Sequence, residues 1–182
     1  SEEFNPEDFY ADDEMVITIS HLGYIKRTPL SEFRTQNRGG VGPKGSDTRE
    51  GDVVEYIYMA TMHNTMIFFT QKGRCYWLKV YEIPEGTKNS KGRAIQNMLN
   101  IDADDKVNAF VHVKNLADKD FVNSHYLMFC TKNGVVKKTC LEAYSRPRTN
   151  GVNAITIRED DRVIEVAMTN GDNEVILANK KG

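Results

Sequence analysis

The chain has 182 residues, of which 40% are hydrophobic and 27% are charged, and this size and composition allow one domain with a sizeable core or a few stacked repeats. No stretch approaches the roughly 20 apolar residues that span a bilayer, and the acidic N-terminal segment lacks the basic and apolar regions of a secretory signal, so we expect a cytoplasmic protein without a membrane role. The formal net charge of −2 excludes a protein that is basic as a whole, so any nucleic-acid binding depends on how the charges are distributed.

A short pattern recurs along the chain and predicts a tight hairpin at each occurrence. In chain order, an apolar run is followed by a small or polar residue, two further residues and a glycine. The runs are residues 16–19, 66–69, 127–130 and 175–178, and the glycines are Gly23, Gly73, Gly134 and Gly182. Because glycine adopts positive φ without steric cost, it is the residue that such a turn favours.

The similarity continues after the first three glycines. Apolar or aromatic residues recur seven and ten positions later, at Leu30 and Phe33, Val80 and Ile83, and Leu141 and Tyr144. A glycine-bearing loop follows, and then an acidic turn begins a further apolar run at Asp52, Asp105 and Asp161. Each repeat thus contains about four short strands, and no segment has a periodicity that predicts a helix. Repeats of this kind predict an all-β fold, a propeller-like array of four-stranded blades.

The repeats divide the chain at predicted boundaries. An acidic segment covers residues 1–13, and the blades cover residues 14–62, 63–116 and 117–170. Residues 171–182 are interpreted as the start of a fourth blade, because the chain stops on the glycine that opens the next hairpin. We therefore expect about three blades and the start of a fourth from a longer array.

Positive charge is concentrated at one position of the repeat. Segments 24–49, 71–93 and 132–148 each have a net charge of +4, whereas the acids gather near the N-terminus and in the acidic turns. One such segment alone is typical of a solvated face. Three of them at the same repeat position favour a basic rim that follows the phosphate backbone of a curved duplex with little base specificity.

Residues 36–42, with the sequence QNRGGVG, resemble the gyrase A box of the DNA gyrase A C-terminal domain family. Most of the box matches the family pattern, at Gln36, Arg38, Gly39, Gly40 and Gly42. The pattern has basic residues where this chain has Asn37 and Val41. Glycines let a backbone approach phosphates closely, and an arginine can donate two parallel hydrogen bonds to phosphate oxygens. The motifs at 89–94 and 145–151 extend the resemblance over nearly all of residues 12–182.

The resemblance implies a six-bladed β-pinwheel and a part in DNA gyrase, an ATP-dependent type II topoisomerase. It implies that the domain wraps double-stranded DNA, so that the A2B2 holoenzyme, formed with the remainder of the gyrase A subunit and with the gyrase B subunit, introduces negative supercoils. Residues 1–13 would then be the linker from an upstream cleavage domain. The resemblance implies no catalytic residue, metal or cofactor in this chain, since ATP and Mg²⁺ bind elsewhere in the holoenzyme.

The candidate DNA contacts are the matched box residues and basic residues of the three segments. They are Gln36, Arg38, Gly39, Gly40, Gly42, Lys26, Arg27, Arg34, Lys44, Arg49, Lys79, Lys91, Arg93, Lys137, Lys138, Arg146 and Arg148. In the second repeat, Tyr76 and Trp77 replace the two basic residues that follow the hairpin glycine in the other repeats. We expect these aromatic side chains to pack between blades rather than to stack on bases.

The sequence gives no indication of chemistry within the chain. Cys75, Cys130 and Cys140 are far apart and do not have the spacing of zinc ligands or of a redox pair, and the four histidines have no thiol or carboxylate at a meaningful spacing. There is no Walker loop for ATP. Two other functions stay open, namely the C-terminal domain of a topoisomerase IV subunit, which shares the blade fold, and a propeller-type module that recognises proteins.

Overall fold

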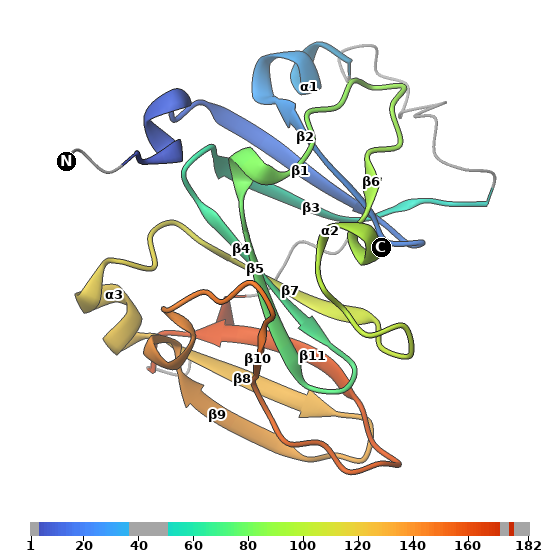
Figure 1. Ribbon diagram of the computed structural model, residues 1–182, viewed down its shortest axis with the longest axis vertical. Helices are drawn as coiled ribbons and strands as arrows, with labels where there is room; N and C mark the ends of the chain where they lie inside the picture. The colour runs from blue at the N-terminus through green and yellow to red at the C-terminus, as the bar shows by residue number, and fades with distance from the viewer. Residues whose placement is uncertain (1–3, 37–50, 172–174, 177–182) are drawn as a thin grey trace. The chain divides into compact units, whose positions relative to one another are not determined.

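The computed structural model describes residues 4–36, 51–171 and 175–176, and the chain divides into two compact units (Figure 1). Among these residues, the first unit contains 4–36, 51–64 and 79–95, and the second contains 65–78, 96–171 and 175–176. The described residues form three four-stranded sheets, one in the first unit and two in the second. The predicted all-β fold with four-stranded blades is confirmed.

The sheet of the first unit has the strand order β3-β1-β2-β6, and all its strand pairs are antiparallel. Its strands are β1 (Glu14–Ser20), β2 (Tyr24–Pro29), β3 (Val54–Thr61) and β6 (Arg93–Ala94). Every residue of β1 after Glu14 is buried. Because successive side chains of a strand point to opposite faces, both faces of β1 are covered. The helical segments of this unit are η1 (Pro6–Phe9), α1 (Leu30–Gln36) and η2 (Val80–Glu82).

The second unit contains two sheets, with the strand orders β10-β5-β4-β7 and β12-β11-β8-β9. The strands of one sheet are β4 (Thr65–Thr70), β5 (Arg74–Lys79), β7 (Val107–Val113) and β10 (Val152–Asn153). Those of the other are β8 (Tyr126–Thr131), β9 (Val136–Cys140), β11 (Val163–Thr169) and β12 (Val175–Ile176).

Short helices are a feature that the sequence did not predict. Besides α1, the structure contains α2 (Ile95–Met98), α3 (Lys119–Ser124) and the 3₁₀ segment η3 (Leu141–Tyr144). The longest of the described α-helices has seven residues. A helix of two turns or fewer is too short to show a clear 3.6-residue periodicity, so the expectation of no helix was wrong for a physical reason.

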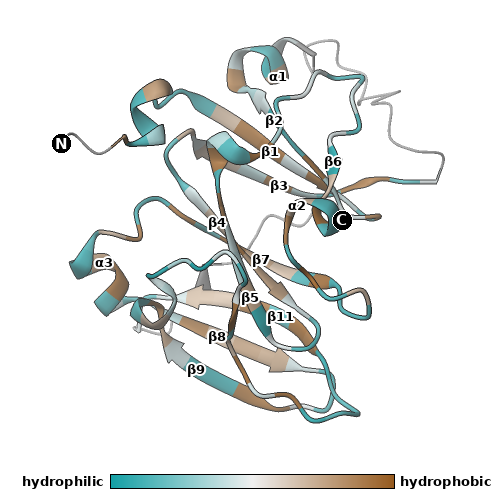
Figure 2. Ribbon diagram, viewed as in Figure 1, coloured by the Kyte–Doolittle hydropathy of each residue, from teal (hydrophilic) through white to brown (hydrophobic). Residues whose placement is uncertain are grey.

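The core of the second unit lies between its two sheets. Ile67 and Phe69 of β4 belong to the same buried cluster as Leu127 and Phe129 of β8. The Phe69 ring meets the Phe129 ring edge to face, with centroids 5.3 Å apart and an interplanar angle of 86°. This geometry adds to the gain from burial, because the positive ring edge faces the negative ring face. Figure 2 shows hydrophobic residues along β8 and β11 and hydrophilic residues in the loops that join the strands.

The predicted hairpin glycines have the predicted conformation. The φ angles of Gly23, Gly73 and Gly134 are 88°, 89° and 88°. In each turn the glycine amide donates to the carbonyl of the residue three positions earlier, at 3.0 Å. The side-chain oxygen of that earlier residue accepts from the amide that follows the glycine, at 3.0, 3.0 and 3.1 Å. The fourth predicted glycine, Gly182, lies outside the described residues.

The acidic turn of each repeat holds the tip of its own hairpin. The Oδ1 atom of Asp105 accepts from the backbone amides of Lys72, at 3.1 Å, and Lys106, at 2.8 Å. Asp52 and Asp161 make the equivalent pairs of bonds at the other two tips. The recurrence of this acid therefore has a structural cause, since an aspartate that bonds local backbone amides fixes a tight turn.

The outermost strand of two sheets comes from the following repeat. In the first unit, β6 belongs to the predicted second blade but pairs with β2, with Tyr24 opposite Ala94. In the second unit, β10 belongs to the predicted third blade but pairs with β5, with Cys75 opposite Val152. Each of these two sheets thus takes three strands from one repeat and its outermost strand from the next repeat. The sequence predicted instead that all four strands of a sheet belong to one repeat.

Candidate nucleic-acid interface

The predicted box begins where α1 ends. Its members Arg38, Gly39, Gly40 and Gly42, and the nearby candidates Lys44 and Arg49, lie outside the described residues. Gln36 is the last residue of α1. Arg34 lies in the last turn of that helix and is exposed. Of the basic candidates, the structure therefore describes Arg34 and those that follow the hairpins.

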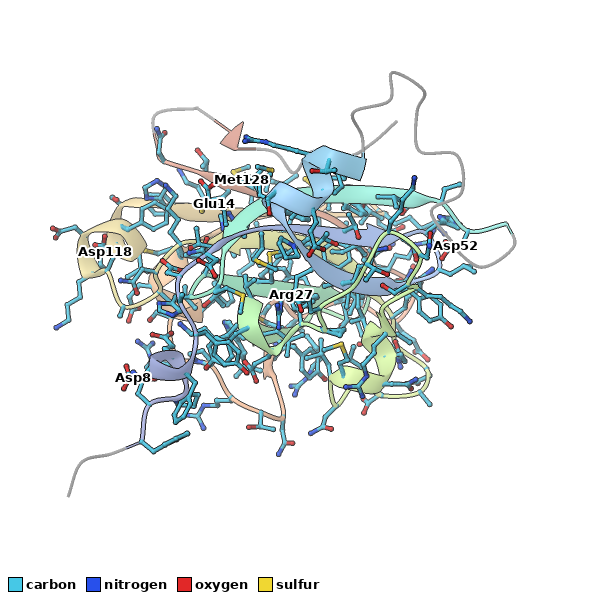
Figure 3. The ribbon with its side chains drawn as sticks, turned by 90° about the horizontal axis from the view of Figure 1, so that it is seen from above. Asp8, Glu14, Arg27, Asp52, Asp118 and Met128 are labelled. Carbon is cyan, nitrogen blue, oxygen red and sulfur yellow. The ribbon has the colours of Figure 1, made fainter. Side chains whose placement is uncertain are left out.

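Lys26 and Arg27 of β2 point into the first unit. The Lys26 ammonium donates to two backbone carbonyls of the turn at residues 87–90, at 2.8 and 2.7 Å. Burial lowers the pKa of this lysine. The Arg27 side chain is only 12% exposed and lies against residues 83–85 (Figure 3). Both candidates thus make contacts within the chain, which leaves them less free to meet a phosphate than their charge alone indicated.

Arg27 and Trp77 occupy the same position of the repeat and make the same contact. Arg27 Nε donates to the carbonyl of Ile83 at 2.7 Å, and Trp77 Nε1 donates to the carbonyl of Tyr144 at 2.9 Å. Each acceptor lies ten residues after the next hairpin glycine. Trp77 also packs against the core of the second unit, and Tyr76 is 3% exposed. Trp77 thus contacts the next repeat, as the expectation of packing between blades requires, whereas the Tyr76 hydroxyl donates to the Asn100 carbonyl within its own repeat.

Lys79 is held by an acidic segment of the first unit. Its Nζ atom lies 2.5 Å from Glu7 Oε1 and 3.2 Å from the carbonyl oxygen of His63. Its side chain is 33% exposed. A phosphate group would have to displace the Glu7 carboxylate to reach this ammonium, so Lys79 is less available than its place in the basic segment indicated.

Besides Arg34 and Arg146, five of the described candidates are exposed cations. In the first unit these are Lys91 and Arg93, which lie just before and within β6. In the second unit they are Lys137 and Lys138 on β9 and Arg148 in the loop that leads to β10. None of these five has an ion pair within 4.0 Å among the described residues of the chain. Among the described residues, no carboxylate therefore neutralises these five charges by a direct ion pair.

Two cations at the second-unit surface have weak partners. Lys138 Nζ lies 4.6 Å from the centre of the Tyr126 ring. Arg146, the remaining candidate, forms an ion pair with Glu142 on the surface of the protein. Contacts of this kind contribute little at an exposed surface, because water screens the charges, so a phosphate can compete for either side chain.

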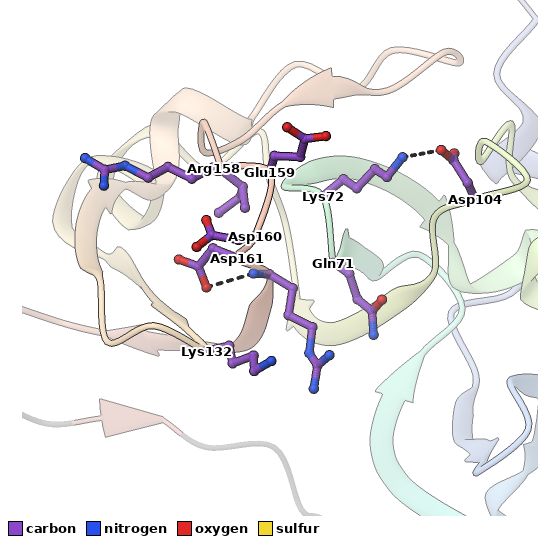
Figure 4. A pocket seen from close by; sticks show the side chains of 10 residues that line it. Gln71, Lys72, Asp104, Lys132, Arg158, Glu159, Asp160 and Asp161 are labelled. Atoms are coloured by element: carbon purple, nitrogen blue, oxygen red, sulfur yellow. Dashed lines mark hydrogen bonds and ion pairs between the residues drawn. The ribbon is translucent and has the colours of Figure 1, made fainter.

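A groove in the second unit contains cations that the candidate set omitted (Figure 4). It has a volume of about 540 Å³ and lies beside the hairpin tips. The charged residues that line it are Lys72, Lys132, Arg158, Arg162, Asp104, Glu159, Asp160 and Asp161. Lys72 forms an ion pair with Asp104. Equal numbers of acids and bases make this groove a poor site for a polyanion.

The sequence indicated two of the four omitted cations. Lys72 and Lys132 lie beside the hairpin glycines within two of the basic segments. Arg158 and Arg162 flank three consecutive acids, so no excess of positive charge indicated them.

The described residues provide no group that could hold a metal ion, and the thiol of Cys75 is buried. No group of His, Cys, Asp and Glu residues among positions 4–36, 51–171 and 175–176 could hold a metal ion. Burial raises the pKa of the Cys75 thiol, and a protonated thiol is a poor nucleophile. In the same stretches of chain, no helix is long and apolar enough to cross a membrane.

Comparison with known proteins shows which family the chain resembles. The chain matches the family described as DNA gyrase C-terminal domain, beta-propeller, over residues 14–60, 64–114 and 125–170. It is 41% identical over 179 residues to the DNA gyrase A subunit of Halalkalibacterium halodurans, in a match that covers 98% of this chain and 21% of that protein. For the DNA gyrase A subunit of Staphylococcus aureus the identity is 41% over 176 residues, which cover 97% of this chain and 19% of that protein. The chain thus spans about a fifth of the length of these relatives.

Solved structures give the same fold. The C-terminal domain of DNA topoisomerase IV matches 88% of this chain and 47% of its own length, with a TM-score of 0.73 and 26% identity. A DNA gyrase A C-terminal domain matches 88% of this chain and 49% of its own length, with a TM-score of 0.60 and 17% identity, which supports the fold alone.

Proposed function

This chain belongs to the family of the DNA gyrase C-terminal domain, and from that premise we propose that it binds duplex DNA and wraps it without reading the base sequence. The observation that carries the proposal is that two successive basic segments both present exposed cations, at Lys91 and Arg93 in segment 71–93 and at Lys137 and Arg148 in segment 132–148. Cations that recur along a curved array can contact phosphates at intervals, and each contact releases counterions from the DNA.

The described surface favours backbone contact over base readout. Sequence-specific binding generally places a helix or a two-stranded ribbon in the major groove. Lys91, Arg93, Lys137 and Arg148 lie on short strands and in turns. Phosphate contacts combined with DNA bending give affinity that depends strongly on salt and weakly on sequence.

We propose that the complete protein is the A subunit of a DNA gyrase. Its partners would be double-stranded DNA and the gyrase B subunit, with which it would form an A2B2 holoenzyme. In that enzyme the cleavage of DNA and the hydrolysis of ATP with Mg²⁺ take place elsewhere, and this domain fixes the sign of the DNA crossing. The enzyme would then introduce negative supercoils.

The test is a salt titration of duplex binding by the full-length protein. The variant Lys137→Met with Arg148→Met should lower the slope of log affinity against log salt by about 0.9 for each phosphate that is no longer neutralised. The matched control is Lys119→Met, because Lys119 is an exposed lysine of α3 outside the three basic segments. Equal slopes for the wild type and the double variant, or a strong preference for one DNA sequence, would refute the proposal.

A second candidate is a topoisomerase IV subunit, which the TM-score of 0.73 with that C-terminal domain supports. The two enzymes differ in outcome rather than in fold. A gyrase converts relaxed plasmid into negatively supercoiled plasmid when ATP is present, whereas a topoisomerase IV relaxes and decatenates DNA. The reconstituted holoenzyme, incubated with relaxed plasmid and ATP, distinguishes them on a single gel.

A further inference from the structure

The turn at residues 84–93, which we name the basic turn, carries three cations of the first unit. Lys91 and Arg93 are exposed, and Lys88 is partly exposed. The turn ends in β6, which pairs with β2 through Ile25 and Arg93. Its geometry therefore decides where these three charges lie.

Lys26 holds the middle of the basic turn from within the unit. Its Nζ atom donates to the carbonyl oxygen of Thr87 at 2.8 Å and to that of Ser90 at 2.7 Å. Ser90 closes the same turn, since its Oγ atom accepts from the Thr87 amide at 2.8 Å. Two carbonyl acceptors orient the ammonium toward the protein backbone. Burial lowers the pKa of Lys26, as expected for a cation removed from water.

The ends of the basic turn are fixed by the backbone of β2. The Arg27 amide donates to the carbonyl of Pro84 at 2.9 Å, and the Gly86 amide donates to the carbonyl of Arg27 at 2.8 Å. A Cβ atom at Gly86 would lie 2.8 Å from Lys26 Cδ. At Gly92, where φ is 79°, a Cβ atom would lie 2.2 Å from the carbonyl oxygen of Ile25. Both glycines let the turn approach β2 closely.

We propose that Lys26 is a positioning residue for DNA binding, which holds the basic turn so that Lys88, Lys91 and Arg93 meet phosphates, and that Lys26 itself contacts no phosphate. This inference rests on the proposed function. Its physical basis is preorganisation, because a turn that is already ordered loses less conformational entropy when it binds. Lys26 thus differs in role from Lys88 and Lys91 of the same unit, although all three carry the same charge in the sequence.

The test compares Lys26→Met, Lys26→Arg and Lys91→Met in the full-length protein, with a plain duplex of mixed sequence as the probe. Lys26→Met should weaken binding by roughly tenfold at every salt concentration, because the turn must then be ordered on binding. Its salt slope should stay unchanged. Lys91→Met should lower the slope by about 0.9, because it removes one phosphate contact. Lys26→Arg keeps N–H donors for the two carbonyls and should restore most of the affinity.

Hydrogen exchange of the backbone amides at 86–94 provides the second readout. We expect faster exchange there in Lys26→Met and wild-type exchange in Lys91→Met. A slope lowered by about 0.9 in Lys26→Met, with protection of the turn unchanged, would show that Lys26 contacts DNA directly and overturn the proposal. Wild-type affinity in Lys26→Met despite faster exchange of the turn would overturn it as well.

If Lys26→Met does not fold, Ser90→Ala tests the same proposal. Ser90→Ala loosens the same turn without removing a charge, since it removes the oxygen that bonds the Thr87 amide. It should lower the affinity and leave the salt slope unchanged, and unchanged affinity with faster exchange of the turn would contradict the inference. Failure of the proposed function has a different signature, because the wild type itself would then show no salt-dependent binding.

Discussion

Trp77 Nε1 donates a hydrogen bond to the carbonyl oxygen of Tyr144 at 2.9 Å and so joins the second repeat to the third. Arg27 makes the equivalent bond to Ile83 one repeat earlier, at 2.7 Å. An indole and a guanidinium have little in common except an N–H group at the end of a flat side chain. The contact at this repeat position therefore requires an N–H donor that reaches a carbonyl of the next repeat, and it does not require a positive charge.

The first prediction concerns this bond between repeats. Trp77→Phe keeps an aromatic ring against the core but removes the donor, leaving the Tyr144 carbonyl without this partner. We expect the free energy of unfolding to fall by about 1 to 3 kcal/mol, the cost of a missing hydrogen bond together with some weaker packing. Urea unfolding measures the change. Leu22→Ala, at an exposed hairpin tip, is the control and should stay within about 0.5 kcal/mol of the wild type.

The second prediction concerns the aspartate that holds each hairpin tip. Asp105 is 7% exposed and accepts from the amides of Lys72 and Lys106. Asp105→Ala leaves two amides without this acceptor, and we expect a loss of about 1 to 3 kcal/mol in unfolding free energy. Asp105→Asn keeps one acceptor oxygen and should lose less. Equal stability of the alanine variant and the wild type would show that water replaces the carboxylate at no cost.

The hairpin turns show which features could be predicted from the sequence and which could not. The hairpin glycines were predictable because a tight turn with positive φ leaves a local signature at Gly23, Gly73 and Gly134. The recurrence of the acidic turn was visible, but its bonds to the hairpin tip were not, since they join residues about 30 positions apart.

That the outermost strand of a sheet comes from the following repeat could not be predicted, for a similar reason. The pairing of Tyr24 with Ala94 joins two repeats across 70 residues, whereas strand patterns report only local alternation. The inward direction of Lys26 was hidden too, because a lysine has the same charge in the sequence whether its ammonium meets water or a backbone carbonyl. The recurrence of positive charge can be read from the sequence, whereas the contacts of each cation can be read only from the structure.

The third prediction concerns pH. Burial, with a smaller effect of Lys114, lowers the pKa of His112 to about 4 from an ordinary value of 6.5. Between these values the unfolded chain takes up a proton that the folded chain resists. The contribution of His112 to stability is therefore complete above pH ~6.5 and is lost as the pH falls toward ~4, by at most about 1.4 kcal/mol per pH unit.

Urea midpoints of the wild type and His112→Gln between pH 7 and pH 5 measure this contribution. We expect the wild type to lose more stability than the variant across this range. Parallel curves would show that His112 is protonated in the folded state as readily as in the unfolded chain.

The fourth prediction concerns the acidic segment before β1. The Tyr10 and Tyr81 rings stack with centroids 4.8 Å apart, and the His63 ring Nε2 lies 2.7 Å from the Tyr10 carbonyl oxygen. Glu7 adds the ion pair with Lys79. Tyr81→Ala should therefore speed hydrogen exchange at the amides of residues 8–13 while the amides of β1 keep their protection. Unchanged exchange in this segment would mean that the ion pair and the His63 contacts suffice to hold it.

The last prediction concerns the box residue Arg38, which lies outside the described residues. Under the proposed function, DNA cleavage and ATP hydrolysis take place in other domains, so removing a wrapping contact leaves strand passage chemically intact. What changes is direction, because the captured DNA segment no longer crosses with a fixed sign and passage then proceeds toward relaxed DNA. Arg38→Ala should cost about 1.5 to 3 kcal/mol of binding if the guanidinium makes a charge-assisted phosphate contact.

The measurement is a pair of gel assays on the reconstituted holoenzyme, one for supercoiling of relaxed plasmid and one for relaxation of supercoiled plasmid. We expect Arg38→Ala to lose most of the supercoiling activity and to retain relaxation, and Lys119→Ala to retain both. Undiminished supercoiling would give Arg38 no part in wrapping. Equal loss of both activities would point to damage to the fold, because relaxation needs strand passage but no fixed crossing, and only the loss of supercoiling alone identifies a wrapping contact.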